Sequence, residues 1–103
     1  MLCNNLIYIL NRAGGPPREM YAEPVKPLNE YEVGDSIVCF AHGYPQPSFE
    51  WINMRTFETF HDSVLTIPEE WLGTTQIMTC VASNKFDDAS FSTDHLITVT
   101  VPG

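Results

Sequence analysis

Short segments of the chain alternate apolar and polar residues with a period of two, which is the pattern of half-buried β-strands. Residues 36–42 follow this pattern, and so do residues 48–53, in which Phe49 and Trp51 share one side. Further strands are expected at 63–67, 76–83 and 96–101, which alternate in the same way or are rich in β-branched residues. The pattern therefore predicts an all-β protein whose inward residues form a core between two sheets.

The inward positions of these strands predict the composition of the core. It should contain Ile37, Cys39, Ala41, Phe49, Trp51, Leu65, Ile67, Met78, Cys80, Ala82 and Val99. Pro68 lacks a backbone N–H and should end the strand at 63–67. The two glutamates that follow it suit the start of a single helical turn, where the helix dipole favours negative charge. Trp71 or Leu72 would then cover the lower end of the core.

Residues 1–22 are expected to be a lead or linker outside the folded domain, which should span residues 23–103. The stretch at 13–17, rich in glycine and proline, is typical of a linker. The apolar run at 6–10 is either a short added strand or the remnant of a preceding segment. A first edge strand is expected at 24–27, because prolines are tolerated at sheet edges where no donor to the ladder is needed.

Two cysteines and a tryptophan stand in the order Cys39, Trp51, Cys80, and a Gly-x-Pro-x-Pro corner at 43–47 joins two of the predicted strands. In these features the chain resembles an immunoglobulin domain of the intermediate set, or I-set. The resemblance covers about residues 23–101. It implies an antiparallel β-sandwich of about seven strands in two sheets, with a disulfide between Cys39 and Cys80 and the indole of Trp51 packed against it.

The chain departs from the family at one corner of the sandwich. Relatives carry a tyrosine two residues before the second cysteine, with its hydroxyl bound to nearby backbone, and this chain has Met78 there. Methionine fills apolar space but cannot make that hydrogen bond, so we expect a looser corner. A variable-type domain would need room for extra strands, so an I-set or constant-like arrangement fits better. Residues 54–62 should hold one short strand at most.

Length and charge limit the classes of partner. The chain has 103 residues, which is room for one domain. Thirteen acidic residues against five basic ones give a formal net charge of −8. Such a charge repels nucleic acid and anionic lipid headgroups, so no nucleic acid is expected as a partner. No apolar run approaches the roughly 20 residues of a membrane helix, so no direct membrane insertion by this chain is expected.

The number and spacing of the cysteines indicate the cellular compartment of the protein. Cys3, Cys39 and Cys80 include no closely spaced pair of the kind that binds zinc. A single disulfide, with Cys3 as the odd thiol, persists in oxidising compartments and indicates an extracellular or cell-surface protein. The targeting signal would then lie elsewhere in a longer protein. The alternative is a cytoplasmic, muscle-type immunoglobulin domain in which all the cysteines are reduced.

The sequence carries no motif for catalysis. His42, His61 and His95 are not at metal-ligand spacing, and none of them adjoins a serine or cysteine in a nucleophile motif. We therefore expect no enzyme activity, no metal and no cofactor. A calcium site at Asp87, Asp88 and Asp94 is an alternative, but their spacing matches no twelve-residue calcium loop, and adjacent aspartates are also typical of turns.

Residues 84–89 are expected to form the loop between the last two strands, known as the F–G loop. Lys85, Phe86, Asp87 and Asp88 are its candidate binding residues, because aromatic side chains on exposed loops of a rigid scaffold are common anchors of interfaces. The alternative is that Phe86 folds back onto the end of the sandwich.

The resemblance implies a non-catalytic module of an adhesion, receptor or matrix protein, which contacts a protein partner or another copy of itself. Two alternatives stay open. One is a structural spacer in a multi-domain protein, including the cytoplasmic muscle type, and the other is a soluble immune-type binder that acts alone. Because one fold hosts many functions, the binding site has to be argued separately.

Overall fold

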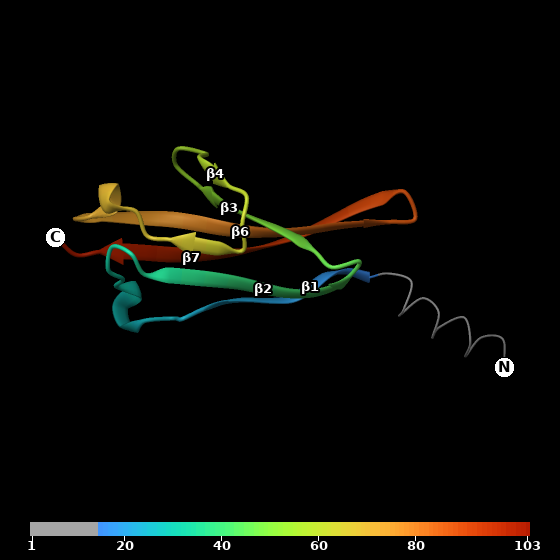
Figure 1. Ribbon diagram of the computed structural model, residues 1–103, viewed down its shortest axis with the longest axis horizontal. Helices are drawn as coiled ribbons and strands as arrows, with labels where there is room; N and C mark the ends of the chain where they lie inside the picture. Colours follow the sequence, from blue (N-terminus) through green and yellow to red (C-terminus); the bar gives the residue numbers. More distant parts are fainter. Residues whose placement is uncertain (1–14) are drawn as a thin grey trace.

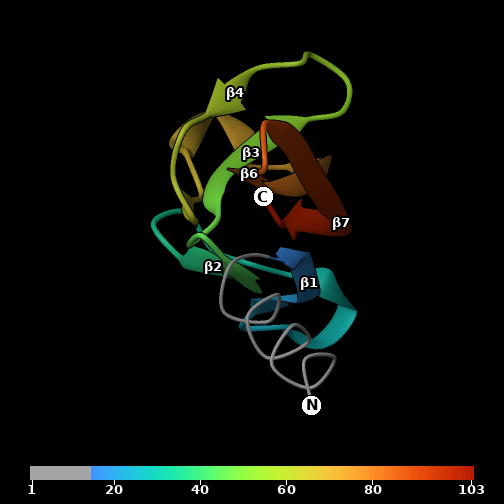
Figure 2. The same ribbon diagram turned by 90° about the vertical axis from the view of Figure 1, so that its right-hand side faces the viewer.

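The computed structural model describes residues 15–103, which form two stacked antiparallel sheets (Figure 1 and Figure 2). The strands are β1 (Gly15–Glu23), β2 (Ser36–Tyr44), β3 (Ser48–Asn53), β4 (Thr59–Phe60), β5 (Val64–Thr66), β6 (Thr74–Phe86) and β7 (Ala89–Val101). Two 3-10 turns, η1 (Pro27–Asn29) and η2 (Glu69–Trp71), lie between them. One sheet has the order β1-β2-β5 and the other the order β4-β3-β6-β7. The immunoglobulin-like antiparallel β-sandwich of about seven strands is confirmed.

A disulfide joins the two sheets. Cys39 comes from β2 and Cys80 from β6, and their Cα atoms lie 6.5 Å apart. Trp51 of β3 lies directly opposite Cys80 in the strand register, and all three residues belong to one buried cluster. The indole Nε1 donates a hydrogen bond to the Ser63 carbonyl at 2.9 Å, so the one polar group of the indole is satisfied inside the core.

The core follows the predicted inward positions closely. Every predicted core residue is buried except Ala41 and Phe49, which are half-buried. Trp71 of η2 is buried while Leu72 is 56% exposed, so Trp71 is the residue that covers this end of the core. The structure adds four buried residues that the sequence pattern did not assign with certainty to the core: Ala22, Tyr31, Trp71 and Val101.

The edge strand of the three-stranded sheet begins earlier than the sequence predicts. β1 pairs with β2 over Gly15–Glu23, whereas residues 24–27 form a connection that leads into η1. The expected strand at 24–27 is therefore wrong, and residues 15–22 belong to the sandwich instead of to a linker. Two register shifts interrupt β1, and Glu19 has a positive φ of 54°. Because bulges break the alternation of inward and outward side chains, the sequence pattern hides this strand.

The last two strands form one long hairpin. β6 and β7 pair without a register shift along their full length, from Thr74 opposite Val101 to Phe86 opposite Ala89. Only Asp87 and Asp88 lie between them, with φ values of 51° and 60°. Two successive residues with positive φ make the tight turn whose twist matches the flanking strands. The connection expected as a loop at 84–89 is therefore only a two-residue turn at 87–88. The tip of the hairpin extends past the start of β1 in Figure 1.

Residues 54–62 hold one short strand, as expected. This strand, β4, pairs with β3 through Trp51 opposite Phe60 and Ile52 opposite Thr59. It therefore extends the sheet of β3, β6 and β7. In constant-type immunoglobulin domains the strand that follows this position belongs to the opposite sheet.

Candidate functional site

The solvent side of the four-stranded sheet carries a group of aliphatic side chains, which we call the outer-face patch: Ile52, Met54, Ile77 and Leu96. Ile52 of β3 and Leu96 of β7 both lie opposite Thr79 of β6, so the three residues form one row across the sheet. The Met54 N–H donates to the Ile77 carbonyl at 2.9 Å, which extends the pairing of β3 with β6 into the next row. Directly opposed residues share a face, so these side chains all point away from the core.

Three of the four side chains of the outer-face patch are exposed, and Ile52 is half-buried. Leu96 is 61% exposed, Met54 43% and Ile77 39%. Thr79, which also faces outward, is only 6% exposed because it lies between Ile52 and Leu96. Contiguous exposed apolar side chains on a rigid sheet are typical of protein interaction sites, whereas single exposed ones need no explanation.

Acidic side chains border the outer-face patch on one side. Glu50 of β3 and Asp94 of β7 lie opposite Val81 of β6, in the row next to the Ile52 row. His61 Nδ1 lies 3.3 Å from Glu50 Oε2, and its side chain is largely exposed. An apolar centre with a charged border is the usual organisation of a protein interface. The acidic border has the same sign as the net charge of −8.

The turn between β3 and β4 is held rigidly by one buried asparagine. The Oδ1 atom of Asn53 accepts hydrogen bonds from the backbone N–H groups of Arg55 at 2.9 Å and Thr56 at 3.1 Å. Its Nδ2 atom donates to Gln76 Oε1 at 3.0 Å, and both side chains are buried. The amide is satisfied on both sides, and it ties the start of the turn to β6.

This turn presents an aromatic side chain to solvent. Phe57 is 71% exposed and has a φ of 63°, and its N–H donates to the Asn53 carbonyl at 2.7 Å. A left-handed conformation costs a residue with a side chain about 1–2 kcal/mol, which the surrounding hydrogen bonds offset. The alternation of apolar and polar residues does not predict this turn. An asparagine at the end of a predicted strand is a signal for such a turn, but the pattern does not show that Phe57 is exposed.

The predicted binding residues lie at the hairpin tip, away from the outer-face patch. Asp87 and Asp88 form the turn itself. The ring of Phe86 stacks on that of Phe91 with a centroid distance of 4.7 Å, so it packs within the hairpin. Lys85 is exposed and shares a face with Ile77, but it lies eight residues further along β6, or about 26 Å.

The other candidates from the sequence do not come together. Among residues 15–103, no group of three or more His, Cys, Asp or Glu side chains could hold a metal ion. His42 lies in β2, His61 follows β4 and His95 lies in β7. The thiol of Cys3 lies outside the described residues. No helix in the described part of the chain is long and apolar enough to cross a membrane.

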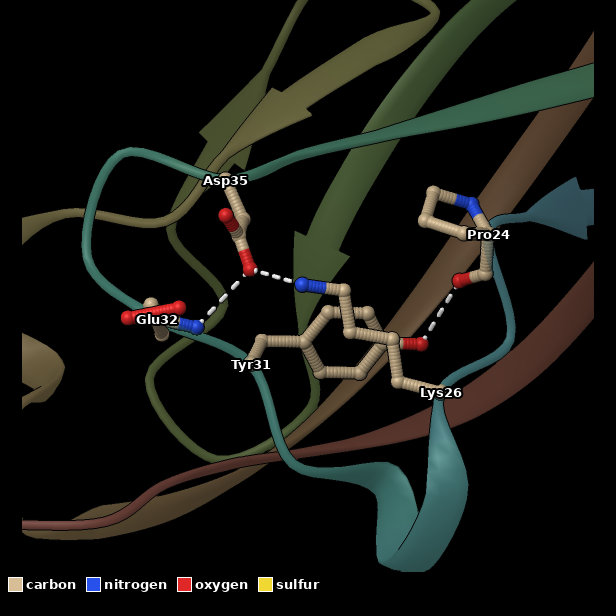
Figure 3. Close-up of polar contacts among 5 residues, drawn as sticks. All are labelled: Pro24, Lys26, Tyr31, Glu32 and Asp35. Atoms are coloured by element: carbon tan, nitrogen blue, oxygen red, sulfur yellow. Dashed lines mark hydrogen bonds and ion pairs between the residues drawn. The ribbon is translucent and has the colours of Figure 1, made fainter.

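A polar cluster fastens the connection between β1 and β2 (Figure 3). Lys26 Nζ donates to Asp35 Oδ2, which also accepts the Glu32 N–H at 2.9 Å. The hydrogen bond from Lys26 lowers the pKa of Asp35, and the same contact raises the pKa of Lys26. The buried side chain of Tyr31 donates its hydroxyl to the Pro24 carbonyl at 2.8 Å. These contacts satisfy one another within the connection, which is the arrangement of a structural clasp.

The comparisons with known proteins agree with this architecture. No protein-family model matches the chain, and no curated protein matches it. Among solved structures, the chain is similar to an IgVJ-C2 molecule of amphioxus, with a TM-score of 0.61 and 21% sequence identity. The match covers 84% of this chain but only 45% of the amphioxus chain. Likeness at this level of identity concerns the fold, and the described part of the chain is accordingly an immunoglobulin-like domain.

Proposed function

We propose that the chain is a non-catalytic recognition module of I-set type in a cell-surface or secreted protein, and that it binds a protein partner through the outer-face patch. The observation that carries this proposal is the pair of adjoining rows in which exposed Met54, Ile77 and Leu96 and half-buried Ile52 share the outer face of one sheet. Aliphatic side chains in such rows lose water-exposed area together when a flat partner docks, at about 25 cal/mol per Å² of apolar surface.

Two further features support recognition over a spacer function. Phe57 is a further exposed apolar side chain three residues after Met54, on a turn whose backbone is already hydrogen-bonded to Asn53, so ordering of this backbone costs little on binding. The acidic row of Glu50 and Asp94 supplies a charged border that selects a partner with a basic rim.

The Cys39–Cys80 disulfide supports an oxidising compartment. The hairpin tip with Lys85 stays a second, separate prediction of a contact region.

The test is binding of the secreted full chain, displayed as a multivalent fusion, to an array of purified extracellular domains. Ile77→Glu places a charge in the middle of the patch. Its matched control is Val64→Glu, because Val64 is 37% exposed and also points outward from a strand, but from the other sheet. We expect Val64→Glu to bind like the wild type and Ile77→Glu to lose at least tenfold in affinity.

Two results would contradict the proposal in different ways. If wild type and both variants bind the same domain equally, the module recognises its partner through another face. If the wild type binds no domain of the array even in multivalent form, the spacer interpretation is favoured instead. Circular dichroism and thermal unfolding of each variant establish that a loss of binding does not come from a loss of fold.

A further inference from the structure

The described residues contain four sheet edges, and three of them are protected against pairing with another chain. β1 carries two prolines and two register shifts, with Glu19 in a left-handed conformation. β4 is two residues long and β5 is three. Short strands, prolines and bulges are the usual means by which proteins prevent edge-to-edge pairing. The fourth edge, β7, is 13 residues long, contains no proline or lysine and pairs with β6 without a register shift.

One hydrogen bond shows which residues of β7 direct their backbone N–H and C=O groups away from β6. The Thr100 carbonyl accepts the Tyr31 N–H at 2.8 Å, so the backbone groups of Thr100 point away from β6. Backbone groups of a strand alternate between its two sides. Those of Ser90, Ser92, Asp94, Leu96 and Thr98 therefore also point to the free edge. Within residues 15–103, β7 forms no other pairing there than an isolated bridge between Thr100 and Glu30.

We propose that β7 pairs antiparallel with β7 of a second copy of this chain, so that two four-stranded sheets continue as one. A two-fold axis at Leu96 places each Leu96 opposite its counterpart, and each Asp94 opposite Thr98 of the other copy. In this register three opposed pairs exchange about six main-chain hydrogen bonds. A second copy is the natural occupant, because a symmetric pairing uses the same strand twice and needs no second complementary sequence.

The side chains favour the register centred on Leu96. A register centred on Asp94 would place two carboxylates directly opposite each other, which is destabilising. Centring on Leu96 instead buries the most exposed member of the outer-face patch against its own copy. A cleft of about 320 Å³ lies along the same edge, between residues 95–98 on one side and Ala22, Pro24, Val25, Asn29 and Tyr31 on the other, so the incoming strand has to pair outside these residues. Met54 and Ile77 stay exposed in this dimer, so the inference goes beyond the proposed function although it shares Leu96 and Asp94 with the proposed binding surface, and the two are tested with different variants.

Charge makes this dimer weak and gives it a characteristic response to salt. Each copy carries a formal charge of −8, so the two copies repel each other. Raising NaCl from about 0.02 M to about 0.5 M shortens the screening length from roughly 20 Å to roughly 4 Å. The dimer should therefore become tighter with added salt, whereas association driven by opposite charges would become weaker.

Sedimentation velocity of the full chain, from about 1 µM to about 1 mM, tests the pairing. Leu96→Lys places a charge at the centre of the paired edge. Leu72→Lys is its matched control, because Leu72 is 56% exposed, lies outside the strands and changes the net charge equally. We expect Leu72→Lys to dimerise like the wild type and Leu96→Lys to dimerise at least tenfold more weakly. A chain that stays monomeric at every concentration, or variants that behave alike, would overturn the proposal.

Hydrogen exchange of the same chain, measured by NMR, tests the edge itself. The amides of Asp94, Leu96 and Thr98 should become protected only as the concentration rises, whereas those of His95 and Ile97, which face β6, should be protected throughout. If the first three are already protected in dilute monomer, residues 1–14 or another part of the chain cover the edge, and the proposal is wrong. As a check of register, Leu96→Cys in a Cys3→Ser background should form an intermolecular disulfide, because opposed Cα atoms lie about 5.5 Å apart.

Discussion

Removing the Cys39–Cys80 bridge, in a Cys39→Ala/Cys80→Ala double variant, should lower the free energy of unfolding by about 4 kcal/mol. The bridge joins residues with a sequence separation of 41. In the chain-entropy model, closing a loop of that length removes about 13 cal/mol/K from the unfolded ensemble, or about 4 kcal/mol at 25 °C. Because small domains have total stabilities of about 5–15 kcal/mol, this loss removes roughly a quarter to four fifths of the free energy of unfolding.

The double variant changes two things at once, since both sulfur atoms are buried and their removal also leaves space in the core. Wild-type chain reduced with dithiothreitol keeps the sulfur atoms and lacks only the bond. Urea unfolding of the oxidised, reduced and doubly substituted chains, followed by tryptophan fluorescence, therefore separates the cross-link from the packing. The reduced chain should lose most of the 4 kcal/mol, which corresponds to a fall in melting temperature of roughly 20 °C.

A reduced chain that unfolds within about 1 kcal/mol of the oxidised one would refute the loop-closure argument. Thiol labelling of chain from its native source tests the compartment in the same preparation. One reactive thiol out of the three cysteines is expected for an oxidising compartment, and three reactive thiols would support the cytoplasmic alternative.

Two further predictions concern polar contacts. Asn53→Ala should cost about 2–4 kcal/mol, because it removes two hydrogen bonds of the turn and leaves the Oε1 atom of buried Gln76 without its donor. Urea unfolding measures the loss, and a cost below about 0.5 kcal/mol would contradict the prediction. Lys26→Met should destabilise the chain at neutral pH. The pKa of Asp35 is lowered in the folded chain, so its contribution to stability is present above about pH 4 and is lost as the pH falls through that lowered pKa. The pKa of Lys26 is raised in the folded chain, so its contribution is present below about pH 10 and is lost as the pH rises through that raised pKa. Melting temperatures of wild type and variant should therefore converge at acid pH, and a constant difference down to pH 2 would refute the assignment.

Strands with regular alternation were predictable from the sequence. β3 was predicted at 48–53 and is observed over Ser48–Asn53. Such a strand has one side in the core and one in water, so its residue types report its conformation directly. β1 was not predictable in the same way, because its bulges shift the inward positions and its prolines are typical of linkers. The length of the β6–β7 hairpin was also missed, since glycine-free Asp-Asp is an uncommon sequence for a two-residue turn that requires positive φ.

The candidate site, too, was only partly predictable from the sequence. The sequence suggested an aromatic side chain on an exposed loop, but it selected Phe86, which stacks on Phe91, and it passed over Phe57. The outer-face patch draws its members from three separate segments of the chain. Which outward residues become neighbours depends on strand order and register, and these are properties of pairing between distant segments.

The sequence by itself determined the class of fold, the two cysteines and the indole at its centre, and most of the core, because alternation and the Cys-Trp-Cys order depend on local residue types. Only the tertiary structure decided that β4 joins β3, that Ile52, Met54, Ile77 and Leu96 meet on one face, and that β7 is the long edge strand among residues 15–103. The physical reason is that a residue's own chemistry determines whether it is buried, whereas its neighbours across a sheet are determined by hydrogen bonds between strands far apart in the chain.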